Sequence, residues 1–339
     1  MTTASPRRRA SVSDVARHAQ VSVGTVSNVL NRPDRVSDAT RERVLAAIAE
    51  LSFVPSGPAR QLRAGTITTV GAVVLDIANP FFTDVARGIE DRLARDDYTL
   101  MVASSEEDPG REARYLRLFE EHGVQGVMVV PATDDVDHLL ALRARGVGVV
   151  LLDRPSPTPE LASVAVDDVR GGELAARHLV EQGRTRIAFL NGPHAIRQCA
   201  DRLRGVVRAL DDAGLDPAEH LVEVTLGSLN ADGGEVATRA LLARDDRPTA
   251  LFCVNDLVAL GALRTLRREG VDVPGDVAVV GYDDVVFAGE LATPLTSVRQ
   301  PTHRLGERAA DLLLAGTAAP AEHVVFQPEL VVRASSTGG

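Results

Sequence analysis

Apolar segments of strand length alternate with amphipathic segments of helix length through most of this 339-residue chain. From Thr69 onward, the first run of this pattern contains candidate strands at 70–76, 98–103, 126–130 and 147–153. Continuous apolar strands separated by helices are typical of a parallel sheet that is covered by helices on both faces. No other feature of the sequence restricts the possible folds as strongly.

The pattern stops at a proline-rich segment, RPSPTP at 154–159, and then begins again with candidate strands at 186–191, 249–254 and 277–284. Two such runs predict two doubly wound subdomains, with a ligand site in the crevice at the carboxyl ends of the strands. Polar residues at the strand ends are Asp76, Asp153, Asn191, Asn255 and Asp283. One aspartate at a strand end is usually a helix cap, but five polar residues at strand ends predict a shared cleft.

The first 63 residues differ from the rest of the chain in charge. They contain ten arginines and five acidic residues, a net charge of +5, whereas the remainder carries −15, giving −10 in total. A basic segment joined to an acidic body favours nucleic acid as the partner of the first part. Basic termini are also common without such a partner, so charge alone leaves both interpretations open.

Two short helical patterns open this basic segment. Ser11 and Asp14 form a capping-box pattern before the first helix, and Ser22 can cap a second helix that ends near Leu30. The apolar stripe of the first helix consists of Val12, Val15, Ala16 and Ala19. Only about three residues separate the two helices, which is the spacing of a helix-turn-helix.

A third helix is expected from a cap near Ser37 to Leu51. The residues expected on its buried side are Val44, Leu45, Ile48 and Leu51. In the second helix, the residues expected to face the core are Val26, Val29 and Leu30.

The exposed part of the second helix has small, uncharged side chains. Hydroxyl groups and unpaired N–H groups at a helix N-terminus suit close approach to a phosphate. Val23, Gly24 and Asn28 are then placed to meet base edges, and the Asn28 amide can pair bidentately with adenine. A plain three-helix bundle, in which the serines and threonines are only caps, is the alternative that the residues leave open.

The segment from Ser11 to about Leu62 resembles, without gaps, the DNA-binding segment of the lactose/galactose repressor family of bacterial transcription regulators. The matching motifs are VSVGTVSNVLN (21–31), RVSDATRERV (35–44) and AELSFVP (49–55). The resemblance implies DNA contacts from Ser11, Ser13, Ser22, Val23, Gly24, Thr25, Ser27, Asn28, Asn31, Ser37, Ala59 and Leu62. Of these, Val23, Gly24 and Asn28 fall at the positions that read bases.

Residues 56–63, SGPARQLR, resemble the family's hinge helix. By that resemblance, Leu62 enters the minor groove as an apolar wedge and kinks the duplex. Such a helix is too short to be stable alone, so we expect it to form only when two copies pack together on DNA. Taken without the resemblance, the segment PSGP also fits a flexible linker.

The remainder, 67–335, resembles the family's effector-binding core, which is similar to periplasmic sugar-binding proteins of type I. The matching motifs are NPFF (79–82), LLDRP (151–155), DRLRG (201–205), VNDLVALGAL (254–263) and VGYDD (280–284). The effector-binding residues that it implies are Phe81, Phe82, Asp153, Gln198, Arg202, Asn255, Asp283 and Gln300. Carboxylates and a guanidinium fork suit a polyhydroxylated ligand, so we expect a sugar or a sugar phosphate. Ser228 stands where relatives often have a stacking aromatic residue, which argues against a purine.

The expected fold is therefore a small all-α helix-turn-helix head joined to an α/β core of two doubly wound parallel-sheet subdomains. The expected boundaries are 1–55 for the head, 56–66 for the hinge or linker and 67–335 for the core. Within the core, we expect 67–163 with 298–323 in one subdomain, and 164–297 with 324–335 in the other. The chain ends without a heptad segment, so we expect a homodimer and no tetramerising coil.

The predicted function is a cytoplasmic, nucleoid-associated regulator, most simply a repressor of a carbohydrate-utilisation operon, that binds near-palindromic operator DNA and a small effector allosterically. Two cysteines, Cys199 and Cys253, without disulfide or metal-ligand spacing suit a reducing compartment. A solute-binding protein for uptake is the alternative, disfavoured by the head and by the lack of a signal peptide or membrane segment. No phosphate loop, nucleophile elbow or metal cluster is found, so we expect no enzyme, cofactor or metal. The sequence leaves open whether the effector releases DNA or promotes its binding.

Overall fold

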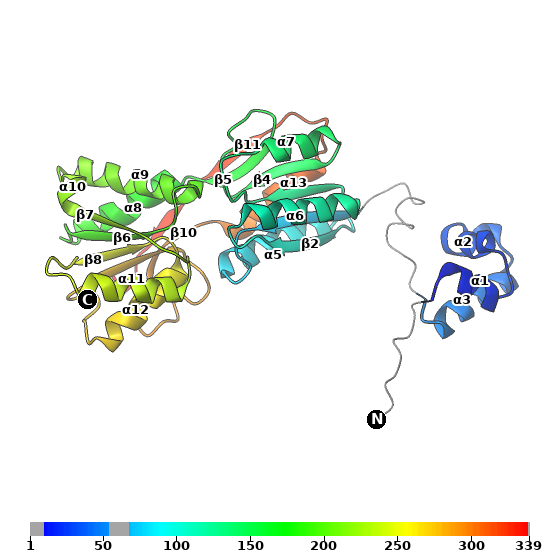
Figure 1. Cartoon of the computed structure of the whole chain (residues 1–339), viewed down its shortest axis with the longest axis horizontal. Helices are drawn as coiled ribbons and strands as arrows, with labels where there is room; N and C mark the ends of the chain where they lie inside the picture. Colours follow the sequence, from blue (N-terminus) through cyan, green and yellow to red (C-terminus); the bar gives the residue numbers. More distant parts are fainter. Residues whose placement is uncertain (1–9, 54–67, 338–339) are drawn as a thin grey trace, which may run out of the picture. The chain divides into compact units, whose positions relative to one another are not determined.

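The computed structural model describes residues 10–53 and 68–337 and divides the chain into two units, Met1–Thr68 and Thr69–Gly339. The first unit contains α1 (Val12–His18), α2 (Val23–Asn31), a 3₁₀ turn (Pro33–Arg35) and α3 (Asp38–Glu50) (Figure 1). This is the helix-turn-helix arrangement that the spacing of the caps predicts.

Capping contacts start the first two helices where the sequence predicts them. The Asp14 N–H donates to Ser11 Oγ at 3.2 Å, and the Ser11 N–H donates to Asp14 Oδ2 at 2.9 Å, which completes the capping box. Ser22 Oγ accepts from the Thr25 N–H at 3.0 Å. The small core between the helices consists of Val15, Ala16, Ala19, Val26, Val29, Val44 and Ala47.

One expected core residue of the head is wrong. Leu45 is 50% exposed, and Ala47 is buried in its place. At 3.6 residues per turn, Val44, Ala47 and Ile48 lie on one face of α3, whereas Leu45 is rotated by about 100° from Val44. The prediction therefore wrongly includes Leu45 in the apolar stripe and leaves out Ala47.

The first subdomain of the second unit is built on a parallel six-stranded sheet in the order β11-β5-β4-β3-β1-β2. Its strands are β1 (Thr69–Val74), β2 (Thr99–Ser104), β3 (Gly126–Val129), β4 (Gly148–Leu152), β5 (Ala162–Val166) and β11 (His323–Phe326). Helices α5 (Pro80–Ala94) and α13 (Thr302–Leu314) pack together on one face. The other face is covered by α6 (Pro109–Glu121) and α7 (Asp137–Ala144).

The second subdomain has a six-stranded sheet in the order β12-β10-β9-β8-β6-β7, in which only β12 is antiparallel to its neighbour. Its strands are β6 (Ile187–Asn191), β7 (Leu221–Thr225), β8 (Ala250–Cys253), β9 (Ala278–Asp283), β10 (Thr296–Arg299) and β12 (Glu329–Val331). Helices α8 (Asp168–Glu181) and α9 (Arg197–Asp212) cover one face, and α11 (Ala231–Leu242) and α12 (Asp256–Arg268) cover the other. A short helix, α10 (Pro217–His220), precedes β7.

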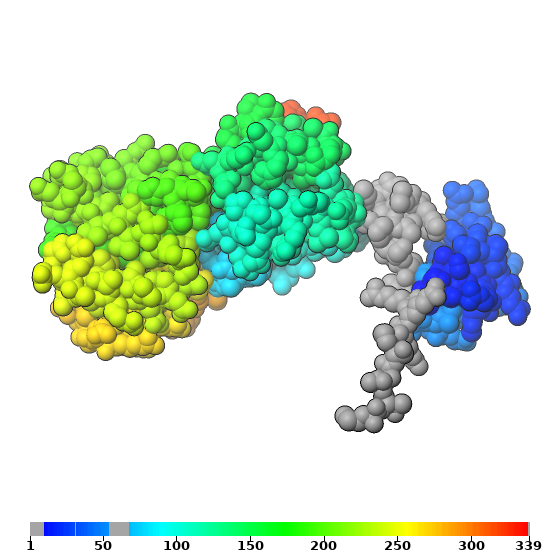
Figure 2. Space-filling view, in the orientation of Figure 1, coloured from blue at the N-terminus to red at the C-terminus, as the bar shows by residue number. Residues whose placement is uncertain are grey.

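The prediction of a helical head and two parallel-sheet subdomains is confirmed, and Figure 2 shows the two subdomains as separate lobes of the second unit. The chain passes between the lobes three times: after β5, after β10 and after β11. The boundaries expected at 163/164, 297/298 and 323/324 fall inside these three strands. The reason is pairing: Ser163 is aligned with His323, so both β5 and β11 extend the first sheet.

Within the residues that the structure describes, no helix combines the length and apolar character needed to cross a membrane.

Candidate functional site

The N-terminal turn of α2 is an exposed, uncharged surface of the head. Val23 is 42% exposed, Gly24 and Asn28 are also exposed, and Thr25 is half-buried. The hydroxyls of Ser22 and Thr25 lie 2.9 Å apart at the start of this helix. The first two turns of α2 therefore combine a helix N-terminus, two hydroxyl groups and an amide without any charged side chain, which suits close approach to a polyanion.

The other residues predicted to contact DNA lie around this helix or outside the described residues. Ser13 is exposed on α1, and Ser37 precedes α3, where its hydroxyl donates to Thr40 Oγ1 at 3.0 Å. Ser27 is half-buried on α2, and the backbone of Asn31 belongs to the same helix. Ala59 and Leu62, with the whole predicted hinge at 56–66, lie outside the described residues.

A cavity of about 460 Å³ lies between the two sheets of the second unit. Four of the five polar strand ends line it: Asp76 after β1, Asp153 after β4, Asn255 after β8 and Asp283 at the end of β9. Parallel strands bring their carboxyl ends to one edge of a sheet, and here two such edges face each other.

Asn191, the fifth strand-end residue, does not line this cavity. Its Nδ2 donates to Glu223 Oε1 at 2.8 Å and to the Cys199 carbonyl at 3.3 Å, and its Oδ1 accepts from the Gly192 N–H. The side chain thus joins β6 to β7 and to α9, and it has a structural role.

Seven of the eight predicted effector-binding residues line the cavity, and all eight are buried. The seven are Phe81, Phe82, Asp153, Gln198, Arg202, Asn255 and Asp283. Gln300 is the exception: it stands behind the wall and donates from Nε2 to Asp283 Oδ1 at 2.8 Å. Ser228 and Leu229 also line the cavity, at the loop where no aromatic residue is present.

The sequence reasoning missed several polar lining residues. They are Asn79, Glu106, Glu107 and Asn230. Glu106 and Glu107 follow β2, which the sequence predicts as a strand at 98–103. The signal that could have found them is their position just after the carboxyl end of a parallel strand, as Asp76 lies just after the adjacent strand β1.

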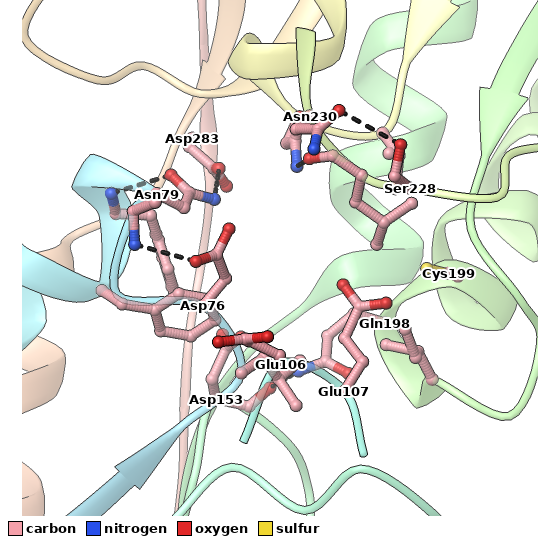
Figure 3. Close-up of a pocket in the computed structure, with 18 of the residues that line it drawn as sticks. Asp76, Asn79, Glu106, Glu107, Asp153, Gln198, Cys199, Ser228, Asn230 and Asp283 are labelled. Carbon is pink, nitrogen blue, oxygen red and sulfur yellow. Dashed lines mark hydrogen bonds between the residues drawn. The ribbon is translucent and has the colours of Figure 1, made fainter. Parts of the chain in front are cut away.

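Two direct hydrogen-bonded pairs join the walls of the cavity (Figure 3). Asn79, the N-cap of α5, donates from Nδ2 to Asp283 Oδ2 at 3.3 Å. Gln198 on α9 donates from Nε2 to the carbonyl and to Oδ2 of Asp153, at 2.8 and 2.9 Å. Each pair links one subdomain to the other, so any relative movement of the subdomains must break or replace them.

Arg202 is held by the protein itself on one side of the cavity. Its Nε donates to Asp168 Oδ1 at 2.8 Å, its Nη1 donates to the Val254 carbonyl at 2.6 Å, and its guanidinium stacks 3.6 Å from the Tyr282 ring centre. The Tyr282 hydroxyl donates to the same Asp168 oxygen. The guanidinium therefore neutralises a buried carboxylate as well as lining the cavity.

Three carboxyl groups of the cavity hold their protons more tightly than usual. Burial raises the pKa of Asp153 well above its usual value, and the nearby Asp168 charge adds to this effect. Burial also raises the pKa of Asp283 to about 6. Burial and the Asp76 charge raise the pKa of Glu107. The cavity is thus an environment in which added negative charge is disfavoured.

Four lining residues have left-handed backbone conformations although none is glycine. Their φ angles are 51° for Glu106, 62° for Glu107, 58° for Asp153 and 103° for Asp283. Such conformations cost free energy and concentrate where a side chain must be presented to a ligand. They mark the same loops that supply the carboxylates.

Comparison with known proteins gives matches to both units. The model for bacterial regulatory proteins of the lacI family matches residues 11–56, and the model for a periplasmic binding protein-like domain matches residues 176–336. The HTH-type transcriptional repressor PurR of Photobacterium profundum is 34% identical over 330 residues, which cover 96% of this chain and 98% of the relative.

Two solved structures are similar to this chain over nearly its whole length. The lac repressor dimer bound to operator and the anti-inducer ONPF is similar with a TM-score of 0.77 and 28% identity, covering 98% of this chain and 100% of that one. A complex of the transcriptional regulator CelR with cellobiose is similar with a TM-score of 0.71 and 34% identity, covering 96% and 100%.

Proposed function

This chain belongs to the lacI family of bacterial regulatory proteins, and we propose that it represses a carbohydrate-utilisation operon from a near-palindromic operator. The family membership makes it a DNA-binding transcription regulator. The choice of operon, the operator, the dimer and the effector are our proposal. The observation that carries it is the pairing of an exposed helix-turn-helix surface with a polar cavity between two subdomains.

On DNA, the proposed roles follow the surface chemistry of α2. Ser22, Thr25 and Ser27 contact phosphates from the N-terminal half of the helix, where N–H groups and hydroxyls favour an anion. The side chains proposed to meet base edges are Val23, Gly24 and Asn28. The remaining proposed contacts come from Ser11, Ser13, Asn31, Ser37, Ala59 and Leu62.

A homodimer is proposed because each head reads one half-site, and a two-fold operator requires two heads. An exposed edge on the first subdomain supports it. Strand β2 is the last strand of its sheet, Val102 on it is 41% exposed, and Leu118 on α6 is 40% exposed. An unpaired edge strand that exposes an apolar side chain offers a surface on which a second copy of the chain can pack. The proposed place of action is the cytoplasm.

The proposed effector is sugar-like. Buried carboxylate and amide groups of the cavity, such as Asp153, Asn255 and Asp283, can accept from and donate to vicinal hydroxyls. Because the Asn79–Asp283 and Gln198–Asp153 pairs join the subdomains, a ligand that replaces either pair changes their relative orientation. That change is the proposed allosteric signal to the hinge.

Footprinting on DNA upstream of the chain's own gene tests the DNA-binding part. We expect a protected near-palindrome with two half-sites, and an affinity that falls steeply with salt because phosphate contacts release counterions. A scrambled duplex of equal length is the control. Equal affinity for the two duplexes would contradict sequence-specific regulation.

A further inference from the structure

We propose that the effector carries a protonated amino group, as an amino sugar does, and that the cavity rejects phosphorylated sugars. This inference rests on the proposed function, because it concerns the effector of the same cavity. It narrows the ligand from a sugar or sugar phosphate to a cationic polyol.

The two walls of the cavity differ in chemistry. The first subdomain contributes four carboxylates, whereas the second contributes one carboxylate, Asp283, the Arg202 guanidinium, which is paired with Asp168, and neutral groups. The neutral groups are the amides and the hydroxyl of Gln198, Asn230, Asn255 and Ser228. Figure 3 shows the carboxylates of Asp76, Glu106, Glu107 and Asp153 grouped together, with Ser228 and Asn230 across the cavity. A ligand that spans the walls therefore meets four carboxylates on one wall and mostly neutral hydrogen-bonding groups on the other.

The protein supplies few cations to this end of the cavity. Arg111 forms an ion pair with Glu106, and Arg202 forms one with Asp168 at 2.8 Å. Among the described residues, no ion pair includes Asp76, Glu107 or Asp153. Three of the four carboxylates on the wall of the first subdomain thus remain without a direct positive partner, and a ligand ammonium group can provide one.

One of these carboxylates has an oxygen that lacks a partner. Asp153 is only 3% exposed, and its Oδ2 accepts from Gln198. Its Oδ1 is buried and has no hydrogen-bond partner among the described residues. A buried acceptor without a donor is costly, and an ammonium group has three N–H donors to offer.

The raised pKa values of Asp153 and Glu107 also favour a positively charged ligand. Burial and the Asp168 charge raise the pKa of Asp153, and burial and the Asp76 charge raise the pKa of Glu107. A cation beside them stabilises their ionised forms and lowers both pKa values, so its binding releases protons. A phosphate group instead adds two negative charges to a site that already suppresses its own.

Matched sugar series on the full-length protein test the proposal. The probes are D-glucose, D-glucosamine and D-glucose 6-phosphate, with the same three forms of galactose and mannose, in thermal shift and calorimetry. We expect the amino sugar of at least one series to bind at least about tenfold more tightly than its neutral parent, and no phosphorylated form to bind. If no amino sugar binds more tightly than its neutral parent, or if a phosphorylated sugar binds, the proposal is wrong. It is also wrong if none of the three amino sugars binds.

Calorimetry in buffers of different ionisation enthalpy provides a second readout. Binding of the amino sugar should release protons at any pH at which the Asp153 or Glu107 carboxyl is protonated in the free protein, and its affinity should rise with pH there. A neutral sugar should release none. Amino-sugar binding without proton release would mean that the ammonium group does not lie against these carboxyls, and would overturn the proposal.

A matched pair of variants separates the cavity from general surface charge. Glu107→Gln should weaken amino-sugar binding about tenfold more than it weakens neutral-sugar binding. Glu121→Gln, an exposed position on α6 of the same subdomain, should change neither. Equal effects of the two variants would overturn the assignment. If a neutral sugar binds and releases the operator, the proposed function stands and only the inference of an amino group is wrong. If footprinting shows only unspecific DNA binding, the proposed function is wrong, and this result does not concern the amino group.

Discussion

Arg202 is predicted as a ligand residue, and the structure gives its side chain a structural partner as well. Asp168 is 4% exposed and depends on the Arg202 guanidinium for its charge compensation. Tyr282 packs against the guanidinium and donates to the same carboxylate. A residue of this kind lines the cavity and also joins α9 to the first residue of α8.

Replacing Arg202 with alanine should therefore affect stability as well as effector response. The change leaves Asp168 buried without a cation, which should lower the free energy of unfolding by about 3–5 kcal/mol. Urea unfolding measures it. Arg208→Ala, an exposed position on the same helix, should shift the value by less than about 0.5 kcal/mol. If the two variants have the same free energy of unfolding, the ion pair between Arg202 and Asp168 does not stabilise the fold.

Asp283 should make stability depend on pH between about 4 and 6. Burial raises its pKa from 3.8 to about 6, so in this range the folded protein binds more protons than the unfolded chain. Stability contributed by the protonated group is therefore complete below pH 4 and is lost as the pH rises to about 6. Thermal unfolding from pH 4 to 7 should show a smaller decline for Asp283→Asn than for the natural protein. A parallel pair of curves would show that Asp283 does not titrate in this window.

At the scale of elements, helix α9 is held close to α8 by glycine. A Cβ atom on Gly172 of α8 would lie 2.1 Å from the Arg202 carbonyl, and one on Gly205 of α9 would lie 2.0 Å from the Val169 carbonyl. The two backbones approach too closely for any other residue. This contact sets the position from which α9 presents Gln198 and Arg202 to the cavity.

Gly172→Ala should force these helices apart. The contact is with backbone, which cannot rotate away, so the free energy of unfolding should fall by about 1–3 kcal/mol and effector affinity should fall with it. Gly289→Ala is the control, because the nearest atom to its added Cβ, in Arg333, is 3.7 Å away. Denaturant unfolding compares the two. A Gly172→Ala protein as stable as the control would contradict the close packing of α8 and α9.

The elements differ in how far sequence could predict them. The seven predicted strands are largely apolar runs, and all seven are present in the two sheets. Strands β7, β11 and β12 are not predicted; they lie at sheet edges and have half-exposed faces. Strand β2 also lies at an edge, but its apolar run makes it recognisable. Strands β5 and β10 are not predicted because the chain crosses between the subdomains directly after each of them. Which sheet each one joins depends on the strand that pairs with it.

At the scale of the whole molecule, a mutation should be able to affect DNA binding without affecting effector binding in the cavity. The proposed link between them is Leu62, outside the described residues. Leu62→Ala should weaken operator binding, because the apolar wedge that stabilises bent DNA is lost. Effector affinity should not change, since the cavity belongs to the second unit. Filter binding and calorimetry measure the two, and a loss of both would show that Leu62 does not act as a hinge wedge.

The sequence by itself determined the class of the fold, because the period of apolar residues and the caps are local properties of the chain, and its motifs indicated the family by resemblance. Only the tertiary structure decided which polar side chains share a cavity and which, like Asn191 and Gln300, support it from behind. The joining contacts connect residues that are far apart in sequence: 45 positions for Asp153 and Gln198, and 204 for Asn79 and Asp283. Their meeting depends on three crossovers between two sheets, and no local pattern encodes the distance between atoms brought together in that way.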